Sequence, residues 1–525
     1  MSGDAESGPA PAAGAAPAAV TRGEVARGAA LAGFARAGSL IDALAQPLFT
    51  WLFGLATYGV YVVLWGAINL VSNLVDLSMT TALNRIVPAA DSEEKVHGAV
   101  KFALLVSVLP ATALAALAAL NAEWLASFVA AAPEDRPSLP AAITIFAWAL
   151  PLWTFIEVAT SAARSRRAFG PEIRLRILWE QSARIVFAIG LFFAGFANLG
   201  LMIAHLGSLA LTALLCVPLL GRYFDLALLV RAPVPARLAR HLLVSGLALL
   251  PSGLGRRLLV DAPPVVLNLM IPGARGATAA GLYEIARKIS TVTFFVRQAF
   301  QYVMGPLAAA QARVDREQIG PLYRFACRVS TALVVPLGGL LIFAGADILS
   351  VYRPEAAAAL PLLYVLVAAR AIEAVVGPAT TLVEMTGHRA YPLVNSLLGA
   401  LLWGLLAWLL VPRLGPLGMA VAAGLATVAI AFAAALELRI GDGLSPFDSK
   451  LGIGLAVALP GVAAMGVAEH LADGPARFAS VLLLWAATSW LALRFGLVRS
   501  DRRALGALAR RLRLVAPHPA RGGEL

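Results

Sequence analysis

Apolar residues form long runs along most of this chain, and short polar or basic connections separate them. A helix that crosses the hydrocarbon core of a bilayer needs about 20 mainly apolar residues. On that scale the pattern predicts fourteen membrane-spanning helices. We place them at residues 29–52, 60–83, 101–121, 141–162, 177–196, 199–220, 241–271, 279–303, 329–350, 359–384, 391–411, 415–436, 451–468 and 477–493.

The composition supports an all-α integral membrane protein. Of 525 residues, 60% are hydrophobic and 14% are charged, a balance that soluble domains rarely reach. Residues 1–27 are rich in Ala, Pro and Gly and lack the apolar core of a signal peptide. We therefore expect a disordered cytoplasmic tail there. Cys216 and Cys327 lie in or beside apolar segments, so neither a disulfide nor a metal site is expected.

The basic residues divide unevenly between the two sides of this topology. If the N-terminus is cytoplasmic, most of the 42 Lys and Arg residues fall in cytoplasmic connections and in the basic tail 496–525. Five fall on the opposite side, namely Arg136, Arg275, Arg353, Arg413 and Arg477. Because cytoplasmic loops hold the Lys and Arg excess, both termini are predicted to be cytoplasmic. The formal net charge of +12 then reflects topology, and nucleic-acid binding is not expected.

The basic stretch from Arg499 to Leu514 allows two interpretations. As an amphipathic helix it would lie on the anionic inner leaflet. As a solvated anchor it would only fix the topology, and this second interpretation is the simpler one.

Eight cations remain within the predicted spans. They are Arg36, Arg184, Arg256, Arg257, Arg287, Lys288, Arg297 and Arg370. Each costs roughly 2.5 to 3.5 kcal/mol at the centre of a lipid-facing helix, and together about 20 to 28 kcal/mol. That total exceeds the net stability of most folded proteins. These side chains are therefore predicted to face a protein interior or water.

Two parts of the chain resemble each other. Gly59-Val60-Tyr61 and Gly281-Leu282-Tyr283 each open a predicted helix that closes with a proline, at Pro88 and Pro306. This repeat predicts two parallel six-helix lobes related by an axis along the membrane normal. We assign residues 28–225 to the N-lobe, 236–440 to the C-lobe and 450–495 to an additional C-terminal helix pair.

Polar residues form stripes on several of these helices. Arg257 and Asp261, Glu284 and Lys288, and Arg370 and Glu373 lie three or four residues apart, and this spacing is equally typical of neutral pairs in a packed bundle. The cations nevertheless outnumber the acids in the predicted seventh helix. A cavity that keeps positive charge suits an anion, and guanidinium groups match phosphate oxygens in bidentate geometry.

The candidate site residues follow from these stripes. For binding an anionic substrate they are Arg36, Arg256, Arg257, Arg287, Lys288, Arg297 and Arg370. For coupling to H⁺ or Na⁺ they are Asp42, Asp76 and Glu373, and no other cofactor is expected. Prolines at 251, 263 and 264 predict that the seventh helix is broken at both ends of its charged centre and that it moves. Pro378 predicts a bend or unwinding in the tenth helix, and Pro336 in the ninth is either such a bend or a purely structural kink.

The chain resembles the lipid-linked oligosaccharide flippases of the multidrug/oligosaccharidyl-lipid/polysaccharide exporter superfamily. The residues that carry the resemblance are Tyr58 to Tyr61, Asn73 to Arg85, Arg166 to Gly170, Gly281 to Ile289, Pro306 and Leu414 to Ala422. The family usually has Gly where this chain has Ser78. The resemblance implies a V-shaped, two-lobed transporter of the bacterial inner membrane. Its implied activity is alternating-access transfer of an undecaprenyl-pyrophosphate-linked glycan to the outer leaflet for polysaccharide biosynthesis, including lipopolysaccharide, with polymerase and assembly proteins as candidate partners.

Other functions fit less well. A multidrug exporter of the same superfamily would usually have twelve helices and acids for cationic drugs. A lipid II flippase fits fourteen helices and a cationic cavity, so it stays open as an alternative. A glycan polymerase or ligase needs an acid/base or metal site in an outer loop, and the longest outer connection has neither a paired-acid motif nor a histidine.

Overall fold

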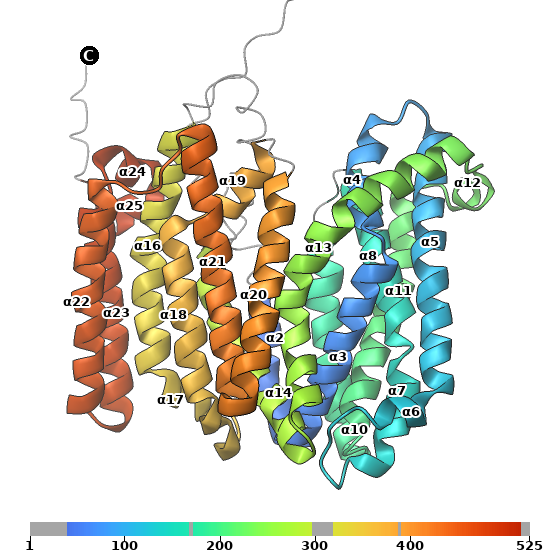
Figure 1. The fold of residues 1–525 in the computed structure, drawn as a ribbon, viewed down its shortest axis with the longest axis horizontal. Coiled ribbons are helices and arrows are strands. Elements are labelled where there is room, and N and C mark those ends of the chain that lie inside the picture. Colours follow the sequence, from blue (N-terminus) through green and yellow to red (C-terminus); the bar gives the residue numbers. More distant parts are fainter. Residues whose placement is uncertain (1–38, 167, 169–171, 297–318, 387–389, 516–525) are drawn as a thin grey trace, which may run out of the picture.

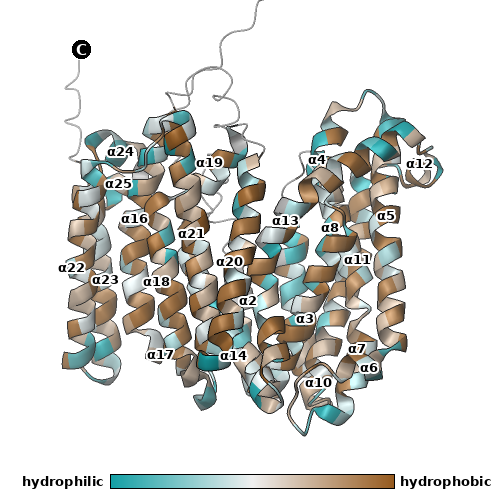
Figure 2. Ribbon diagram, in the orientation of Figure 1, coloured by the Kyte–Doolittle hydropathy of each residue, from teal (hydrophilic) through white to brown (hydrophobic). Residues whose placement is uncertain are grey.

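The computed structural model describes residues 39–166, 168, 172–296, 319–386 and 390–515. Within these residues every regular element is a helix, which confirms the all-α class. The long helices run side by side, with hydrophobic surface along their lengths and hydrophilic residues gathered at the two ends (Figures 1 and 2).

A first bundle comprises residues 39–231. Its helices are α2 (Ser39–Phe53), α3 (Leu55–Val75), α4 (Met79–Ile86), α5 (Glu93–Leu120), α6 (Ala122–Ala126), α7 (Leu139–Phe146), α8 (Ala149–Ser165), the π-helical segment η3 (Ile173–Trp179), α10 (Glu180–Phe193), α11 (Gly200–Tyr223) and α12 (Leu226–Arg231).

A long helix, α13 (Ala236–Met270), leads from the first bundle to the second. The second bundle comprises residues 274–442. Its helices are α14 (Ala274–Ser290), α16 (Ile319–Phe343), α17 (Gly345–Leu349), α18 (Leu360–Val376), α19 (Ala379–Met385), α20 (Ala390–Leu414) and α21 (Pro416–Asp442). The chain ends with α22 (Ser449–Leu471), α23 (Gly474–Gly496), α24 (Arg499–Ala504) and α25 (Ala507–Arg511).

Each of the fourteen predicted spans overlaps one of these helices. Eleven helices within the described residues are long and apolar enough to cross a membrane. The first, fifth and eighth predicted spans correspond to α2, α10 and α14, which do not reach that length. A multi-pass membrane protein is therefore confirmed, whereas the exact count of fourteen crossings is not.

The helix ends place the basic connections on one side. Helices α4, α12, α19, α24 and α25 lie at one end of the molecule, which we call the α24 end, and α6, α7 and α17 lie at the other, the α17 end (Figure 1). Among the described residues, the connections predicted to be rich in Lys and Arg lie at the α24 end (Figure 1). The alternation of helix directions thus agrees with the predicted sidedness.

The two bundles meet through small residues on α3. A Cβ atom added at Gly59 would lie 1.9 Å from the carbonyl oxygen of Ala277 on α14, and one at Gly66 would lie 2.8 Å from that of Asp261 on α13. Larger side chains would separate these helices. Close to the α17 end, α2, α3, α13 and α14 lie together, whereas α4 and α19 stand well apart at the α24 end (Figure 1). The molecule therefore has the predicted V shape; the exact lobe boundaries stay a prediction.

The prediction of a broken seventh helix is wrong. Helix α13 is continuous from Ala236 to Met270 and contains Pro251, Pro263 and Pro264. Each proline removes one backbone donor, but neighbouring hydrogen bonds and packing against α3, α14 and α20 are enough to keep the helix intact. The bend predicted at Pro378 is present, because the chain breaks between α18 and α19 at Gly377 and Pro378, where Gly377 has φ 58°.

The second predicted helix is broken where no break was predicted. Leu77 and Ser78 have φ values of 48° and 58°, which end α3 and begin α4. Ser78 thus adopts the left-handed conformation that glycine takes without steric cost. This conformation explains why glycine is usual at this position in the family that the chain resembles.

The C-terminal helix pair is attached to the side of the second bundle. Helices α22 and α23 pack against α16, away from α3 and α13 (Figure 1). Arg328 on α16 binds the carboxylates of Asp448, which precedes α22, and Asp501 on α24. At the α17 end Arg477 on α23 binds Asp347 on α17. Ion pairs therefore fix both ends of the pair.

Candidate functional site

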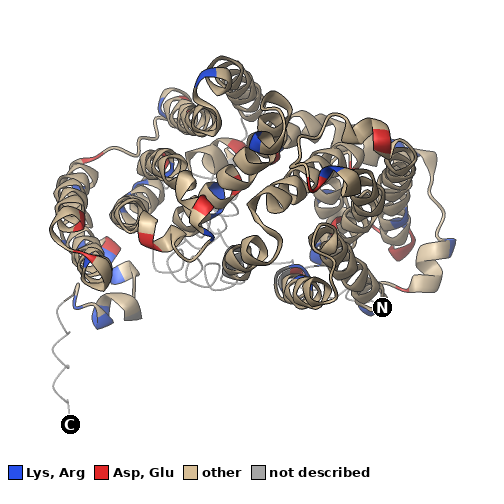
Figure 3. Cartoon of the chain, turned by 90° about the horizontal axis from the view of Figure 1, so that it is seen from below, with Lys and Arg blue, Asp and Glu red and all other residues tan. Residues whose placement is uncertain are grey.

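Charged side chains from four helices gather where α13 and α14 join the two bundles. We call this set the central cluster. Its members are Glu157 on α8, Arg257 and Asp261 on α13, Glu284, Arg287 and Lys288 on α14, and Arg370 and Glu373 on α18. Asp261 lies within electrostatic range of Arg287 and Glu284, which links α13 to α14. Helix α18 packs against α14, and Arg370 lies within electrostatic range of Tyr283 on α14, which adds the α18 pair to the cluster. Seen from the α17 end, charged residues lie among the central helices as well as around the edge (Figure 3).

On α14, Arg287 has a carboxylate partner one turn before it. Its Nε and Nη2 atoms donate to the two oxygens of Glu284 at 2.7 and 2.6 Å, a bidentate contact. Lys288 Nζ lies 4.0 Å from the same carboxylate. The predicted Glu284 and Lys288 pair is thus present, but Arg287 makes the closer contact.

On α13, Arg257 pairs with carboxylates of two different helices. Its guanidinium lies 3.7 Å from Asp261 on the same helix, as the spacing predicted, and 3.8 Å from Glu157 on α8. Glu157 also lies 3.4 Å from Arg176 in η3. The contact from α13 to α8 was not predicted, because residues so far apart in sequence show no common pattern.

On α18, the predicted pair of Arg370 and Glu373 is present. Arg370 Nη1 donates to Glu373 Oε2 at 2.9 Å. The guanidinium carbon of Arg370 also lies 5.2 Å from the ring centroid of Phe294, within the range of a cation–π contact. Arg370 is therefore oriented by two neighbours.

The cations of the central cluster are more exposed than their acids. The side chains of Arg257, Arg370, Lys288 and Arg287 are 41%, 28%, 25% and 21% exposed. Those of Asp261, Glu157, Glu284 and Glu373 are 11%, 10%, 8% and 6% exposed. The described members are formally neutral in sum, so the predicted surplus of positive charge is not found among them. The acids are buried, whereas the guanidinium and ammonium groups paired with them stay partly exposed. An anion can therefore contact these cationic groups.

Other predicted site residues lie outside what the structure describes. Arg36 and Arg297 fall outside the described residues. Asp42 lies on α2 and Arg256 on α13, but their side chains are not among those described. Their assignment to the site therefore stays a prediction.

Asp76, a predicted ion-coupling residue, lies in the turn between α3 and α4. Its carboxylate accepts hydrogen bonds from Thr80 Oγ1 at 2.8 Å and from Ser107 Oγ at 3.4 Å. The residue is only 6% exposed. These hydroxyl contacts fit an acid that pins the turn between α3 and α4. A role of Asp76 in ion coupling stays a prediction.

A second buried network, which the sequence did not predict, lies in the first bundle. Tyr61 Oη lies 3.0 Å from His205 Nδ1 and accepts a hydrogen bond from Arg184 at 2.9 Å. Glu180 Oε1 lies 3.6 Å from His205 Nε2 and 3.8 Å from Arg184 Nε. The four residues come from α3, α10 and α11. Only the spacing of Glu180 and Arg184 was a usable signal, because nothing local connects them with the histidine.

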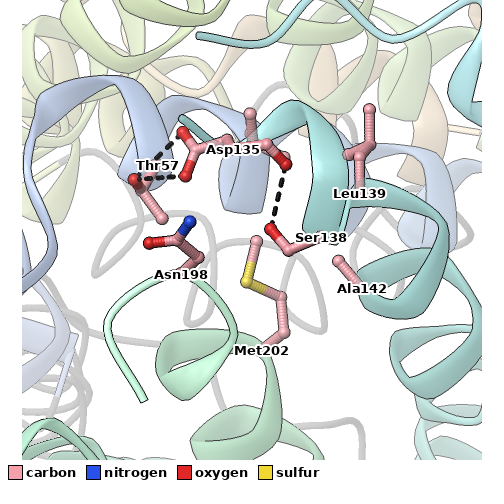
Figure 4. A pocket seen from close by; sticks show the side chains of 8 residues that line it. Thr57, Asp135, Ser138, Leu139, Ala142, Asn198 and Met202 are labelled. Carbon is pink, nitrogen blue, oxygen red and sulfur yellow. Dashed lines mark hydrogen bonds between the residues drawn. The ribbon is translucent and has the colours of Figure 1, made fainter. Parts of the chain in front are cut away.

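A small recess lies in the first bundle, lined by residues of α3, α7 and α11 and of the connections before α7 and α11 (Figure 4). Thr57 donates to the Asp135 carboxylate at 3.0 Å, and Asn198 lies opposite. Burial raises the pKa of Asp135, while the Thr57 hydrogen bond opposes that change. The lining residues include an acid and no cation, so this recess does not match the predicted anion site. Among the described residues, no group of histidines, cysteines and acids could hold a metal ion.

Comparisons with known proteins place this geometry in context. Residues 50–352 match the profile of a family described as "Polysaccharide biosynthesis protein". No curated protein sequence matches the chain. The fold is similar to that of the lipid II flippase MurJ in an inward closed conformation, with a TM-score of 0.71 and 12% identity, over 88% of this chain and 97% of that one.

Two further structures share the fold less completely. A multidrug resistance MATE family transporter in an outward-facing conformation gives a TM-score of 0.60 at 14% identity, over 80% of this chain and 96% of that one. A transporter of the same superfamily from Pyrococcus furiosus gives 0.58 at 14% identity, with the same coverage. At these identities the likeness establishes the fold alone.

Proposed function

Because the chain belongs to this family of polysaccharide biosynthesis proteins, we propose that it is a flippase for a lipid-linked oligosaccharide. The substrate is an undecaprenyl-pyrophosphate-linked glycan of the bacterial inner membrane, moved from the cytoplasmic to the outer leaflet. Both termini and the α24 end face the cytoplasm, since the basic connections gather there.

The observation that carries this proposal is the arrangement of the central cluster. Cationic tips of Arg257, Arg287, Lys288 and Arg370 stand on buried acids at the junction of two bundles. A pyrophosphate offers several oxygens to such guanidinium groups. The polyprenyl tail stays in lipid while the headgroup contacts these cations, and Arg36, Arg256 and Arg297 add to the positive charge.

The membrane potential gives the transfer a direction. Moving two negative charges away from a negative interior gains up to about 4.6 kcal/mol per 100 mV. In the cycle we propose, the bundles rock from contact at the α17 end to contact at the α24 end. An inward flow of H⁺ or Na⁺ bound at Asp42, Asp76 or Glu373 resets the carrier.

The proposal is tested with the full chain in proteoliposomes that contain a fluorescent undecaprenyl-pyrophosphate oligosaccharide. Transfer is measured as the substrate that becomes accessible to a membrane-impermeant glycan oxidant. We expect Arg370→Gln to lower the rate at least tenfold. Arg413→Gln changes an exposed arginine near the end of α20, outside the central cluster, and is the matched control that should transfer at the unmodified rate. Equal transfer rates for the two variants would show that the central cluster does not bind the substrate during transport.

In cells, deletion should cause one lipid-linked glycan to accumulate on the cytoplasmic leaflet. Accumulation of lipid II would instead identify the second candidate, a lipid II flippase. One observation favours that candidate over a multidrug exporter: the likeness to the lipid II flippase covers 88% of this chain, against 80% for the multidrug transporter. Increased drug sensitivity with no accumulated glycan would contradict both flippase assignments.

A further inference from the structure

The chain after α23 folds back on itself to form what we call the C-terminal cap, residues 494–515. Helix α24 and helix α25 are separated by Gly506, which has φ 59°. Trp490 Nε1 donates to the carbonyl of Leu512 at 2.8 Å, and Arg494 Nη1 donates to that of Leu514 at 2.7 Å. The cap is therefore a built structure held against the end of α23.

One face of the cap is buried in the second bundle. Asp501 is 0% exposed and binds Arg328 of α16. Ala509 and Leu514 are each 1% exposed and join the apolar core that contains Leu451 and Leu497. A movement of the cap would thus move the helix pair to which it is fixed.

The exposed part of the cap carries several cations. The exposed arginines of the cap are Arg499, Arg503, Arg510, Arg511 and Arg513. The only acid in the cap sequence is Asp501, which is buried and paired. Within residues 494–515, therefore, no exposed acid offsets the charge of these arginines.

The arginines of the cap also repel one another. Burial and the like charges of Arg494 and Arg499 lower the pKa of Arg502 below its usual value. Holding these like charges close together costs electrostatic free energy. A bound anion would relieve this repulsion, because it lowers the cost of holding the guanidinium groups together.

Apolar side chains stand beside these cations. Phe495 is 51% exposed, Leu508 53% and Leu512 36%. The cap lies directly at the end of the apolar span Gly474–Gly496, at the outer edge of the molecule (Figure 1). Arginines next to exposed apolar residues at the end of a span are suited to the interface of headgroups and acyl chains.

We propose that the C-terminal cap binds the phosphate headgroups of anionic phospholipids in the leaflet at the α24 end. Bound lipids would fix the position of the cap at the membrane surface. Because Asp501 of the cap is paired with Arg328, they would also restrict the movement of α16. This inference does not depend on the transported substrate. Each arginine near an anionic membrane surface contributes about 1 kcal/mol, a factor of about five in affinity.

The test uses the full chain in nanodiscs with a small fraction of phosphatidylglycerol in phosphatidylcholine. A bimane label is attached at Leu508→Cys, since the native Cys216 and Cys327 are both buried. In one set the phosphatidylglycerol carries quenching bromines, and in the other an equal amount of phosphatidylcholine carries them. We expect the brominated phosphatidylglycerol to quench at least threefold more strongly.

The matched variants each replace four exposed arginines by glutamine. The cap variant changes Arg499, Arg503, Arg510 and Arg511, and should lose the preference for phosphatidylglycerol. The control changes Arg222, Arg231, Arg237 and Arg240, which are exposed on α11, α12 and α13, and should retain it. Raising the salt concentration from 0.1 to 1 M shortens the screening length from about 10 to about 3 Å. In the protein that keeps all its arginines, this should also reduce the preference for phosphatidylglycerol.

Three outcomes would overturn the proposal. Equal quenching by the two brominated lipids would show that the cap does not select anionic headgroups. An equal loss in the control variant would show a general basic surface in place of a site in the cap. Loss of the preference on adding inorganic pyrophosphate at low concentration would show that the cap takes a soluble diphosphate, not a phospholipid.

Discussion

The side-chain amide of Asn268 makes both of its hydrogen bonds with the backbone of Ala130. Asn268 Oδ1 accepts from the Ala130 amide at 2.9 Å, and Asn268 Nδ2 donates to the Ala130 carbonyl at 2.7 Å. Asn268 lies near the end of α13, and Ala130 lies in the connection after α6. This contact therefore joins α13 to the first bundle at the α17 end, where the molecule is closed.

Replacing Asn268 should favour opening at that end. Asn268→Ala leaves buried backbone groups of Ala130 without partners, at a cost of about 1–3 kcal/mol each. Spin labels at Glu123 on α6 and Ala357, which are both exposed, should move apart in distance measurements. Asn198→Ala is the control, because Asn198 donates to the Glu134 carbonyl within the first bundle. Unchanged distances in Asn268→Ala would show that the contact does not hold the end closed.

Ser78→Gly should stabilise the protein. Ser78 has φ 58°, and its side chain makes no capping hydrogen bond. Relief of the left-handed strain should gain about 0.5–1 kcal/mol, measured as a higher midpoint of thermal unfolding. Ser92→Gly is the control. Ser92 has φ −147°, which is not strained, and its hydroxyl accepts a hydrogen bond from the Lys95 amide, so this substitution should not raise the midpoint. A lower midpoint for Ser78→Gly would contradict this account of the turn.

Arg257 and Glu157 should be only weakly coupled. Their atoms lie 3.8 Å apart, and the Arg257 side chain is 41% exposed, so solvent screens the pair. A double-mutant cycle of Arg257→Gln and Glu157→Gln should give a coupling of no more than about 1 kcal/mol in unfolding free energy. A coupling above about 2 kcal/mol would mean that Arg257 is committed to its carboxylate and is not available to an anionic substrate.

Arg328→Gln should release the C-terminal helix pair. It leaves the fully buried Asp501 without its cation, and breaking a buried pair in this way costs about 3–5 kcal/mol. Limited proteolysis should then cut near residues 443–448 before the rest of the chain unfolds. Arg439→Gln changes an exposed arginine near the end of α21, and should be cut at the unmodified rate. Identical proteolysis of the two variants would contradict the attachment.

The same attachment should weaken in acid. Burial raises the pKa of Asp448, but the Arg328 hydrogen bonds and charge lower it further, so the net pKa lies below its usual value. A carboxyl group with a lowered pKa contributes stability above its unfolded pKa of about 3.9, and loses it as the pH falls through the folded pKa. Proteolysis of the unmodified protein should therefore accelerate below about pH 4. In Asp448→Asn this component of the acid sensitivity should be absent.

The local sequence was enough to predict the order of the long helices and several contacts of the candidate site. The apolar runs located every described long helix because the bilayer imposes a minimum span. The spacing of Arg257 with Asp261 and of Arg370 with Glu373 predicted the observed pairs, since residues three or four apart share one face of a helix. The glycines at 59 and 281 marked the surface where α3 meets α14, although the sequence did not show which helices they bring together.

Tertiary structure decided what these local patterns could not. The contact of Arg257 with Glu157 and the network of Tyr61, Glu180, Arg184 and His205 join helices that are distant in sequence. The helix α13 stays continuous through its prolines because its neighbours support it. The sequence by itself determined which segments are helices in a membrane and which faces are polar, because helix periodicity and transfer free energy are local. Which cations find carboxylates, and how exposed they remain, depends on how the bundles are placed in three dimensions.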